Sequence, residues 1–296
     1  MDQTLYLGID GGGSTCRARL ADADGRVLGE GRAGAANTLL GVENAFVEIE
    51  TATRAALSDA GLPLETMGRL HAGLGLAGLS LERDLRSVRA HVHPFATATV
   101  RSDAHIACLG AFAGADGAIL IVGTGTCGCA ILQGRETTVG GWGFAVGDQG
   151  SGAALGRAAV RRAILAHDGV IPATALTAAV MAGFGDSPEQ AVLWAQTAKP
   201  KDYAAFAPEV IETAASGDVV AREILQHAVK ELSRFVRALI GRGAPKVALV
   251  GGLAGPIAPW LPDDISAFLT KPLGDALDGA LLLARRHAGA AAEVRT

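Results

Sequence analysis

The first residues suited to chemistry are the sequence DGGGST at positions 10–15, directly after an apolar run. Binding of a phosphate chain needs backbone N–H groups that reach oxygen atoms without an intervening Cβ, which selects glycine. Ser14 and Thr15 add hydroxyl groups, and Asp10 adds a carboxylate that can hold Mg²⁺ directly or through water. The alternative is a plain hairpin turn, but three successive glycines cost backbone entropy without a packing benefit. The sequence therefore predicts a phosphate-binding turn.

A second glycine-rich turn, GTGT at residues 123–126, follows another apolar run. Together with the next two residues it matches the GxGxxG pattern of dinucleotide-binding folds, which requires a helix directly after the glycines. Residues 127–133 instead alternate like a strand, so this interpretation fails. A P-loop fails as well, because its motif needs a lysine and none occurs before Lys199.

The elements that position these two turns form a repeat. A strand, a glycine turn, a second strand, a hairpin and a third strand are predicted twice, over residues 4–9, 16–22 and 26–31, then 117–122, 127–133 and 136–140. Such a repeat implies two related α/β domains with a cleft between them, each offering one phosphate-facing turn.

The remaining pattern is mainly helical, with a few buried strands. Helices are predicted over residues 44–61, 80–91, 105–113 and 275–287, strands over residues 71–76, 97–100 and 247–250, and a mostly helical stretch from 151 to about 242. The strand at 247–250 ends in Gly251 and Gly252.

Composition excludes several classes of function. A net charge of −4 gives no basic face for nucleic acid, and the apolar run at residues 118–122 is far too short to span a membrane. Residues 1–4 lack the basic start and apolar core of a signal peptide, so a cytoplasmic protein is expected. The four cysteines form no CxxC pair, which predicts buried free thiols rather than a zinc site or disulfides: Cys16, Cys108, Cys127 and Cys129.

The paired turns resemble those of the actin-like ATPase superfamily, which includes sugar kinases. The DGGGST turn followed by Arg17 is similar to the branch that contains BadF-type ATPases and N-acetylglucosamine kinases. GGWG at residues 140–143 and GDQGSG at residues 147–152 resemble a segment of hexosamine kinases, nearest to bacterial glucosamine kinases. The resemblance implies two actin-like (ribonuclease H-like) domains, 1–104 plus 274–296 and 105–273, the second with a helical insertion.

Site roles follow from the resemblance position by position. It implies that Asp103 is the catalytic base and that Asp10 lies near Mg²⁺. It implies sugar contacts at Asn37, Asp103, Asp148 and Gln149. It implies ATP contacts at Asp10, Gly12, Gly13, Ser14, Thr15, Arg17, Gly123, Thr124, Gly125, Thr126, Gly251 and Gly252.

Structural alternatives exist for several of these residues. Asp103 precedes a predicted helix, where it would serve as an N-cap. Asn37 and Asp148 are residue types that stabilise turns, and Trp142 is expected to pack beneath the sugar loop. Ser102 stands where many relatives have asparagine, and Gln149 where many N-acetylglucosamine kinases have glutamate.

The function implied by the resemblance is transfer of the γ-phosphate of ATP to the 6-hydroxyl of D-glucosamine, a small-molecule amino sugar. One alternative is an N-acetylglucosamine kinase. Another is a BadF-type ATPase activator, whose iron–sulfur cluster needs cysteines at a subunit interface rather than in core strands. The resemblance also leaves a homodimer as an assembly to test.

Overall fold

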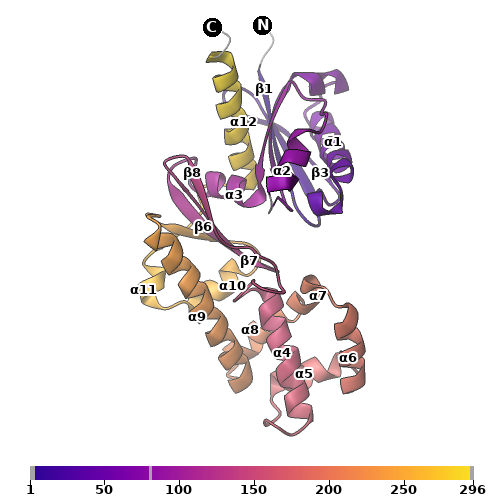
Figure 1. Cartoon of the computed structure of the whole chain (residues 1–296), viewed down its shortest axis with the longest axis vertical. Helices are drawn as coiled ribbons and strands as arrows, with labels where there is room; N and C mark the ends of the chain where they lie inside the picture. The colour runs from indigo at the N-terminus through magenta and orange to yellow at the C-terminus, as the bar shows by residue number, and fades with distance from the viewer. Residues whose placement is uncertain (1–3, 80–81, 294–296) are drawn as a thin grey trace. The chain divides into compact units, whose positions relative to one another are not determined.

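The computed structural model describes residues 4–79 and 82–293 (Figure 1). Contacts group the chain into two units. Unit 1 consists of the residues up to Gly117, the segment Ala130–Glu136 and the residues from Lys271 onward. Unit 2 consists of Ala118–Cys129 and Thr137–Thr270. This division places the helix after Asp103 in unit 1, whereas the domain limits expected from the resemblance place it in the C-terminal domain.

Unit 1 is built on a five-stranded mixed sheet in the order β3-β2-β1-β4-β5. Its strands are β1 (Leu5–Gly11), β2 (Cys16–Ala21), β3 (Val27–Ala33), β4 (Leu70–Leu76) and β5 (Thr97–Ser102). The first three strands pair antiparallel, while β1, β4 and β5 run parallel. The carboxyl ends of the parallel strands therefore lie at one edge of the sheet, where ligands bind in many α/β folds.

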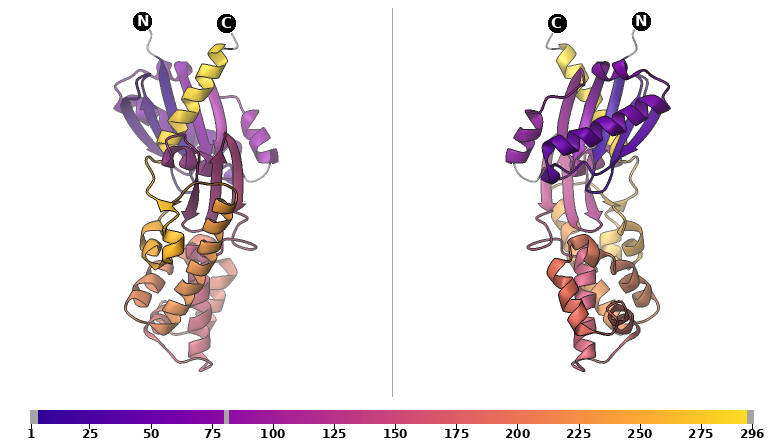
Figure 2. Two further views of the ribbon diagram at one scale, coloured as in Figure 1. Left: turned by 90° about the vertical axis from the view of Figure 1, so that its left-hand side faces the viewer. Right: turned by 90° about the vertical axis from the view of Figure 1, so that its right-hand side faces the viewer.

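Helices cover both faces of this sheet. They are α1 (Val42–Asp59), α2 (Glu82–Arg89), α3 (Asp103–Ala111) and α12 (Ala276–Glu293), with 3₁₀ turns η1 (Thr38–Leu40) and η2 (Leu64–Arg69). The two views of Figure 2 show α12 on one face and α1 on the other. Glycines allow the close approach: Gly73 of β4 lies against the backbone of α12, and Gly31 of β3 lies against α1. The helix predicted at residues 80–91 is seen from Glu82 to Arg89, and its first two predicted residues lie outside the described ones.

Unit 2 repeats the strand order. Its sheet is β10-β9-β6-β7-β8, with β6 (Gly117–Val122), β7 (Thr126–Leu132), β8 (Arg135–Gly140), β9 (Val247–Val250) and β10 (Leu269–Thr270). Contact grouping assigns the tip of the β7–β8 hairpin to unit 1. The strand repeat predicted from the sequence is confirmed, as is the α/β class with two actin-like units. The short strand β10 escaped prediction, because two residues carry no periodic signal.

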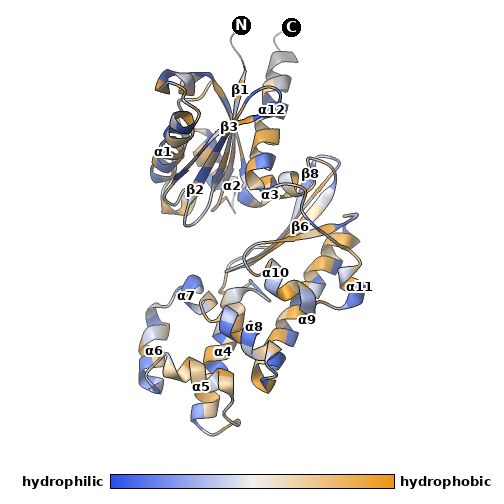
Figure 3. Ribbon diagram, turned by 180° about the vertical axis from the view of Figure 1, so that it is seen from behind, coloured by the Kyte–Doolittle hydropathy of each residue, from blue (hydrophilic) through white to orange (hydrophobic). Residues whose placement is uncertain are grey.

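The stretch from residue 151 to about 242 is helical, as expected, and short helices that were not predicted follow β9. The helices of unit 2 are α4 (Gly152–His167), α5 (Ala175–Ala182), α6 (Pro188–Thr197), α7 (Pro200–Ala204), α8 (Ala207–Ala215), α9 (Val219–Gly241), α10 (Ala254–Ile257), η3 (Ala258–Trp260) and α11 (Asp263–Ser266). The longest, α9, is amphipathic: Ile224, Ala228, Leu232 and Val236 are buried at a spacing of four. Figure 3 shows both polar and apolar residues along this helix. Within the described residues, no helix combines the length and apolar character needed to cross a bilayer.

Candidate functional site

The first glycine turn in unit 1 presents free backbone donors. The Gly12 amide donates to the Thr15 carbonyl at 2.9 Å, which closes the turn. The amides of Gly13, Ser14 and Thr15 have no hydrogen-bond partner within residues 4–79 and 82–293, and all three residues are exposed. Successive unpaired N–H groups on a turn form an anion-binding concavity. A Cβ at Gly13 would come no nearer than 3.8 Å to another group, so the space in front of the turn is open.

Asp10 lies at the end of β1 and is held by Arg17 on β2. The two residues are register partners, and the Arg17 guanidinium donates to Asp10 Oδ2 at 2.6 and 3.2 Å. Arg17 also lies 3.7 Å from the carboxylate of Asp275. Asp10 Oδ1 has no hydrogen-bond partner among the described residues. One free carboxylate oxygen beside a phosphate-binding turn fits Mg²⁺, which is commonly bound through one or two carboxylates plus substrate phosphates.

Asp103 starts α3, directly after β5. In the sheet register, Asp10 pairs with Gly75 and Gly75 pairs with Arg101, so Asp103 and Asp10 lie at the same edge. Burial raises the pKa of the Asp103 carboxyl, and the negative charge of Asp10 raises it further. A carboxyl whose pKa is raised by burial and a neighbouring carboxylate is typical of an active-site base.

The N-cap of α3 is Ser102, not Asp103. The Ser102 hydroxyl accepts the His105 amide at 3.1 Å, whereas Asp103 Oδ1 accepts the amide of the next residue, Ala104, and caps no later amide of the first turn. The capping alternative for Asp103 is therefore wrong. Ser102 supplies the cap and leaves the Asp103 carboxylate for another role.

A partly buried pair, His105 and Glu136, escaped the sequence analysis. The Nδ1–H of His105 donates to Glu136 Oε2 at 2.7 Å, and the Ser102 hydroxyl donates to Glu136 Oε1 at 3.3 Å. The hydrogen bond from His105 holds the pKa of the Glu136 carboxyl below its usual range. Glu136 follows His105 by 31 residues, on a different element, so no local pattern could have joined them.

Asn37 lies next to the first turn and serves as a cap. Its Oδ1 accepts the Leu39 amide at 2.9 Å and starts η1, so the turn role weighed for Asn37 is confirmed. Its Nδ2 faces Gly13 and has no partner in the described part of the chain. The side chain therefore keeps a free donor beside the turn, and its role toward a sugar stays a prediction.

The second glycine turn, in unit 2, is fixed by Asp148. The Thr126 amide donates to Asp148 Oδ1 at 3.1 Å, and a Cβ at Gly125 would lie 2.9 Å from that same oxygen. Asp148 is buried and has a φ of +60°, a conformation that aspartate tolerates better than most residues. The Thr126 hydroxyl is buried without a hydrogen-bond partner, while the Thr124 and Gly125 amides have none among the described backbone groups.

Helix α4 begins directly at this turn. The Gly152 amide donates to the Gly123 carbonyl at 2.8 Å, and the Ala153 amide donates to the Thr124 carbonyl at 3.2 Å. The turn is therefore tied to the start of a helix without opening one itself, and the strand β7 after it confirms that the GxGxxG match is not a dinucleotide site. Trp142 is 70 % exposed, so the prediction that it packs beneath the loop is wrong.

Gly251 and Gly252 follow β9 beside the same turn. Gly251 has a φ of +98°, and a Cβ there would lie 2.5 Å from the carbonyl oxygen of Val122, the residue before Gly123. Only glycine fits this position. A methyl group added at Gly252 would meet nothing within 4 Å, so its backbone is open to a ligand.

The predicted site residues thus fall into two groups, one in each unit. Unit 1 contains Asp10, Gly12, Gly13, Ser14, Thr15, Arg17, Asn37 and Asp103, and unit 2 contains Gly123, Thr124, Gly125, Thr126, Asp148, Gln149, Gly251 and Gly252. Asp148 and Gln149 are adjacent, but only Asp148 is bonded to the turn. Of the four free cysteines, Cys127 is half-buried and the other three are buried. No cluster of three or more metal-ligating side chains occurs in the described parts of the chain.

Comparison with known proteins places the chain in a family. A sequence model of the BadF/BadG/BcrA/BcrD ATPase family matches residues 7–260. The chain is 39 % identical to the glucosamine kinase GspK of Vibrio cholerae, over 94 % of this chain and 95 % of that protein. It is 25 % identical to an N-acetyl-D-glucosamine kinase of Dictyostelium discoideum, over 81 % and 80 % of the two chains.

Solved structures agree with this placement. A Chromobacterium violaceum structure described as an N-acetylglucosamine kinase superposes with a TM-score of 0.88 at 33 % identity, covering 95 % of this chain and 99 % of that one. The chain belongs to the BadF/BadG/BcrA/BcrD ATPase family.

Proposed function

We propose that the protein is an ATP-dependent hexosamine kinase that transfers the γ-phosphoryl group of ATP to the 6-hydroxyl of D-glucosamine. The observation behind this proposal is the set of groups at one edge of the unit 1 sheet. There a carboxyl group with a raised pKa, Asp103, follows a strand beside the turn of free amides at Gly13, Ser14 and Thr15. A base and a phosphate-binding turn at one sheet edge are the parts that phosphoryl transfer to an alcohol requires.

Asp103 acts as the general base in this proposal. Its carboxylate accepts the proton of the sugar 6-hydroxyl as that oxygen bonds to the γ-phosphorus and the bond from phosphorus to the bridging oxygen of ADP breaks. The raised pKa suits the role, because a stronger base takes the proton more readily. The turn amides offset negative charge on the phosphate oxygens.

Both glycine turns are proposed as phosphate-binding turns, each within its own unit. In unit 1 the free amides of residues 13–15 would bind phosphate oxygens, and in unit 2 the GTGT turn would do the same. The open backbone at Gly252 accepts the adenosine, since no side chain fills the space in front of it. Asp10 Oδ1 would hold Mg²⁺, with Arg17 fixing the other carboxylate oxygen. The ion supplies charge neutralisation on the phosphate chain when bound.

Glucosamine is favoured as the acceptor. The similarity to the Vibrio cholerae glucosamine kinase covers nearly the whole chain, and Gln149 replaces the glutamate of many N-acetylglucosamine kinases. The second candidate is an N-acetylglucosamine kinase, which the likeness to the Chromobacterium violaceum structure favours. An ATPase activator is less well supported, because Cys16, Cys108 and Cys129 are buried and a cluster at a subunit interface needs exposed thiolates.

A coupled assay of ADP release, run with glucosamine, N-acetylglucosamine, glucose and water as acceptors, tests the proposal. We expect the highest kcat/KM with glucosamine. Preference for N-acetylglucosamine would select the second candidate, and turnover with water alone would exclude the kinase. A homodimer stays a prediction, which light scattering on the purified protein tests.

A further inference from the structure

A cavity in unit 2 is lined by arginines. It has a volume of about 520 Å³ and is bounded by α4, α9 and the loop of residues 144–150. Cavities of roughly 300–1,000 Å³ commonly take small molecules. Its wall on α4 contributes Arg157, Arg161 and Arg162, and we name it the arginine cavity.

Two of these arginines have no carboxylate partner within the described residues. Arg162 pairs with Glu223 at 3.2 Å, and Glu231, the carboxylate in the cavity wall, pairs with Arg234. Arg157 and Arg161 make no such pair. At a spacing of four they lie on one face of α4, where like charges oppose each other. The cavity therefore holds about two uncompensated positive charges.

Arg157 is also positioned by an aromatic ring. Its guanidinium lies 4.6 Å from the centre of the Phe144 ring, a cation–π contact that fixes the group in the cavity wall. A planar, fixed guanidinium binds phosphate oxygens through paired hydrogen bonds. His227 adds a polar group that can bond a hydroxyl of a larger ligand.

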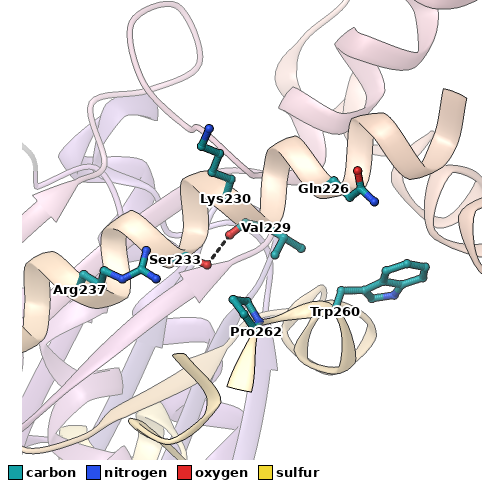
Figure 4. Close-up of a pocket in the computed structure, with 7 residues that line it drawn as sticks. All are labelled: Gln226, Val229, Lys230, Ser233, Arg237, Trp260 and Pro262. Atoms are coloured by element: carbon teal, nitrogen blue, oxygen red, sulfur yellow. Dashed lines mark hydrogen bonds between the residues drawn. The ribbon is translucent and has the colours of Figure 1, made fainter. Parts of the chain in front are cut away.

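A second cavity in unit 2 provides a contrast (Figure 4). Its volume is about 330 Å³, and its walls include Val229, Trp260 and Pro262. Arg237 there pairs with Asp264 at 2.6 Å, and the Ser233 hydroxyl donates to the Val229 carbonyl. In the figure, Lys230 points away from Trp260 and Pro262. Because Arg237 is already paired with Asp264, this arginine does not favour binding of an anion as those of the arginine cavity do.

From this arrangement we propose that the arginine cavity binds the phosphate group of a small phosphorylated sugar. The identity of the sugar rests on the proposed function: its phosphorylated product, a hexosamine 6-phosphate, has the size and the single dianionic group that the cavity fits. The ligand would contact Arg157 and Arg161 through its phosphate and His227 through a hydroxyl.

The loop of residues 144–150 links the cavity to the second glycine turn. Gln149 lines the cavity, while its neighbour Asp148 accepts the Thr126 amide. A ligand that holds the loop from the cavity side restricts the residue that fixes the turn. Occupation of the arginine cavity by the product therefore slows turnover, and excess substrate sugar does not relieve this effect.

Titration calorimetry with glucosamine 6-phosphate tests the site. The wild-type protein is first saturated with glucosamine and a non-hydrolysable ATP analogue, so that the proposed active site is filled. We expect residual binding of the sugar phosphate that weakens about tenfold or more in Arg161→Gln, because a charge-assisted contact to phosphate is lost. Arg157→Gln should weaken it similarly. Arg242→Gln, an exposed arginine outside the cavity, should leave it unchanged.

The controls separate the outcomes. Thermal melting shows whether Arg157→Gln disturbs the fold by releasing Phe144, and the exposed Arg161 provides the second variant. Equal binding of inorganic phosphate would overturn the assignment to a sugar phosphate. Normal turnover with no arginine-dependent binding would sink this inference alone. Arginine-dependent binding without any turnover on hexosamines would sink the proposed function alone.

Kinetics provide an independent readout. Inhibition by glucosamine 6-phosphate should contain a component that saturating glucosamine does not remove. We expect Arg161→Gln to lose that component while its uninhibited kcat stays within about twofold of wild type, since surface substitutions have small effects. Purely competitive inhibition in the wild-type protein would contradict the regulatory role.

Discussion

The Asp148 carboxylate accepts the Thr126 amide at 3.1 Å and so joins the GDQGSG loop to the second glycine turn. The two residues are 22 positions apart, and Asp148 reaches the turn with a positive φ. A residue that the family resemblance assigns to the sugar is thus also a structural part of the proposed nucleotide site. The Asp148 side chain would therefore contact the sugar and also hold the turn that is proposed to bind the phosphates of ATP.

Substitution of Asp148 separates these two roles. Asp148→Ala leaves the buried Thr126 amide unpaired and should destabilise the fold by about 1–3 kcal/mol. It should also raise the KM for ATP. Asp148→Asn keeps an acceptor oxygen and tolerates the backbone conformation, so we expect near-wild-type melting and a raised KM for sugar alone. Asp186→Ala is the control for backbone strain, because Asp186 has a φ of +56°. Equal losses in the two alanine variants would show that the amide contact is unimportant.

Asp103→Asn should remove catalysis and spare the fold. We expect kcat to fall by about 10²–10⁴, the usual contribution of a general base, with ATP affinity retained. The pKa of the Asp103 carboxyl in the folded protein lies above its ordinary value. The stability that this carboxyl contributes is therefore present while it is protonated, and it is lost as pH rises through the folded pKa. At neutral pH the amide should therefore melt no lower than wild type. A lower melting temperature together with lost ATP binding would indicate a structural role.

The loss of activity at acid pH should report the ionisation of Asp103. Asp103 must be ionised to accept a proton, and burial raises its pKa above that of an ordinary aspartate. The value of kcat/KM should therefore fall as pH decreases through a pKa above that of an ordinary aspartate. The measurement is a pH profile at saturating ATP, with melting curves to confirm folding at each pH. Constant activity down to pH 4 would exclude Asp103 as the base.

Glu136→Gln tests the pair of His105 and Glu136. Loss of the charged acceptor for His105 and Ser102 should destabilise the protein by about 1–2 kcal/mol at pH 7. Because the folded pKa of Glu136 is lowered, its stabilisation is present above the ordinary glutamate pKa and is lost as pH falls through the folded one. The difference from wild type should thus shrink toward acid pH. Kinetically, kcat should fall with KM unchanged. Glu65→Gln, at an exposed position of η2, is the matched control.

Gly13→Ala tests the first turn directly. A methyl group at this position meets nothing closer than 3.8 Å, so the melting temperature should change little. If the turn amides bind ATP phosphates, the methyl group should raise the KM for ATP by about tenfold, since it occupies the approach of the oxygens. Gly241→Ala at the end of α9 has similar free space and should leave KM unchanged. An unaltered KM in both variants would remove the turn from the nucleotide site.

Local sequence determined much of this protein. The two glycine turns, the strand repeat and the rejection of a dinucleotide site followed from residue types and a periodicity of two, which depend only on neighbours along the chain. The α/β class could be predicted because the same short pattern occurs twice. The short strand β10 and the cap at Ser102 were missed, since neither leaves a periodic trace.

Only the tertiary structure decided which distant side chains meet. It brought Glu136 to His105 across 31 residues, gave the α3 cap to Ser102, and turned Asp148 toward Thr126. It also gave two adjacent residues different surroundings: Gln149 lines the arginine cavity, while Asp148 bonds to the second glycine turn. Such contacts depend on how strands and helices cross in space, and a single sequence does not encode that crossing in any local pattern. Sequence thus predicted the chemistry of the glycine turns, and the fold determined which side chains hold them.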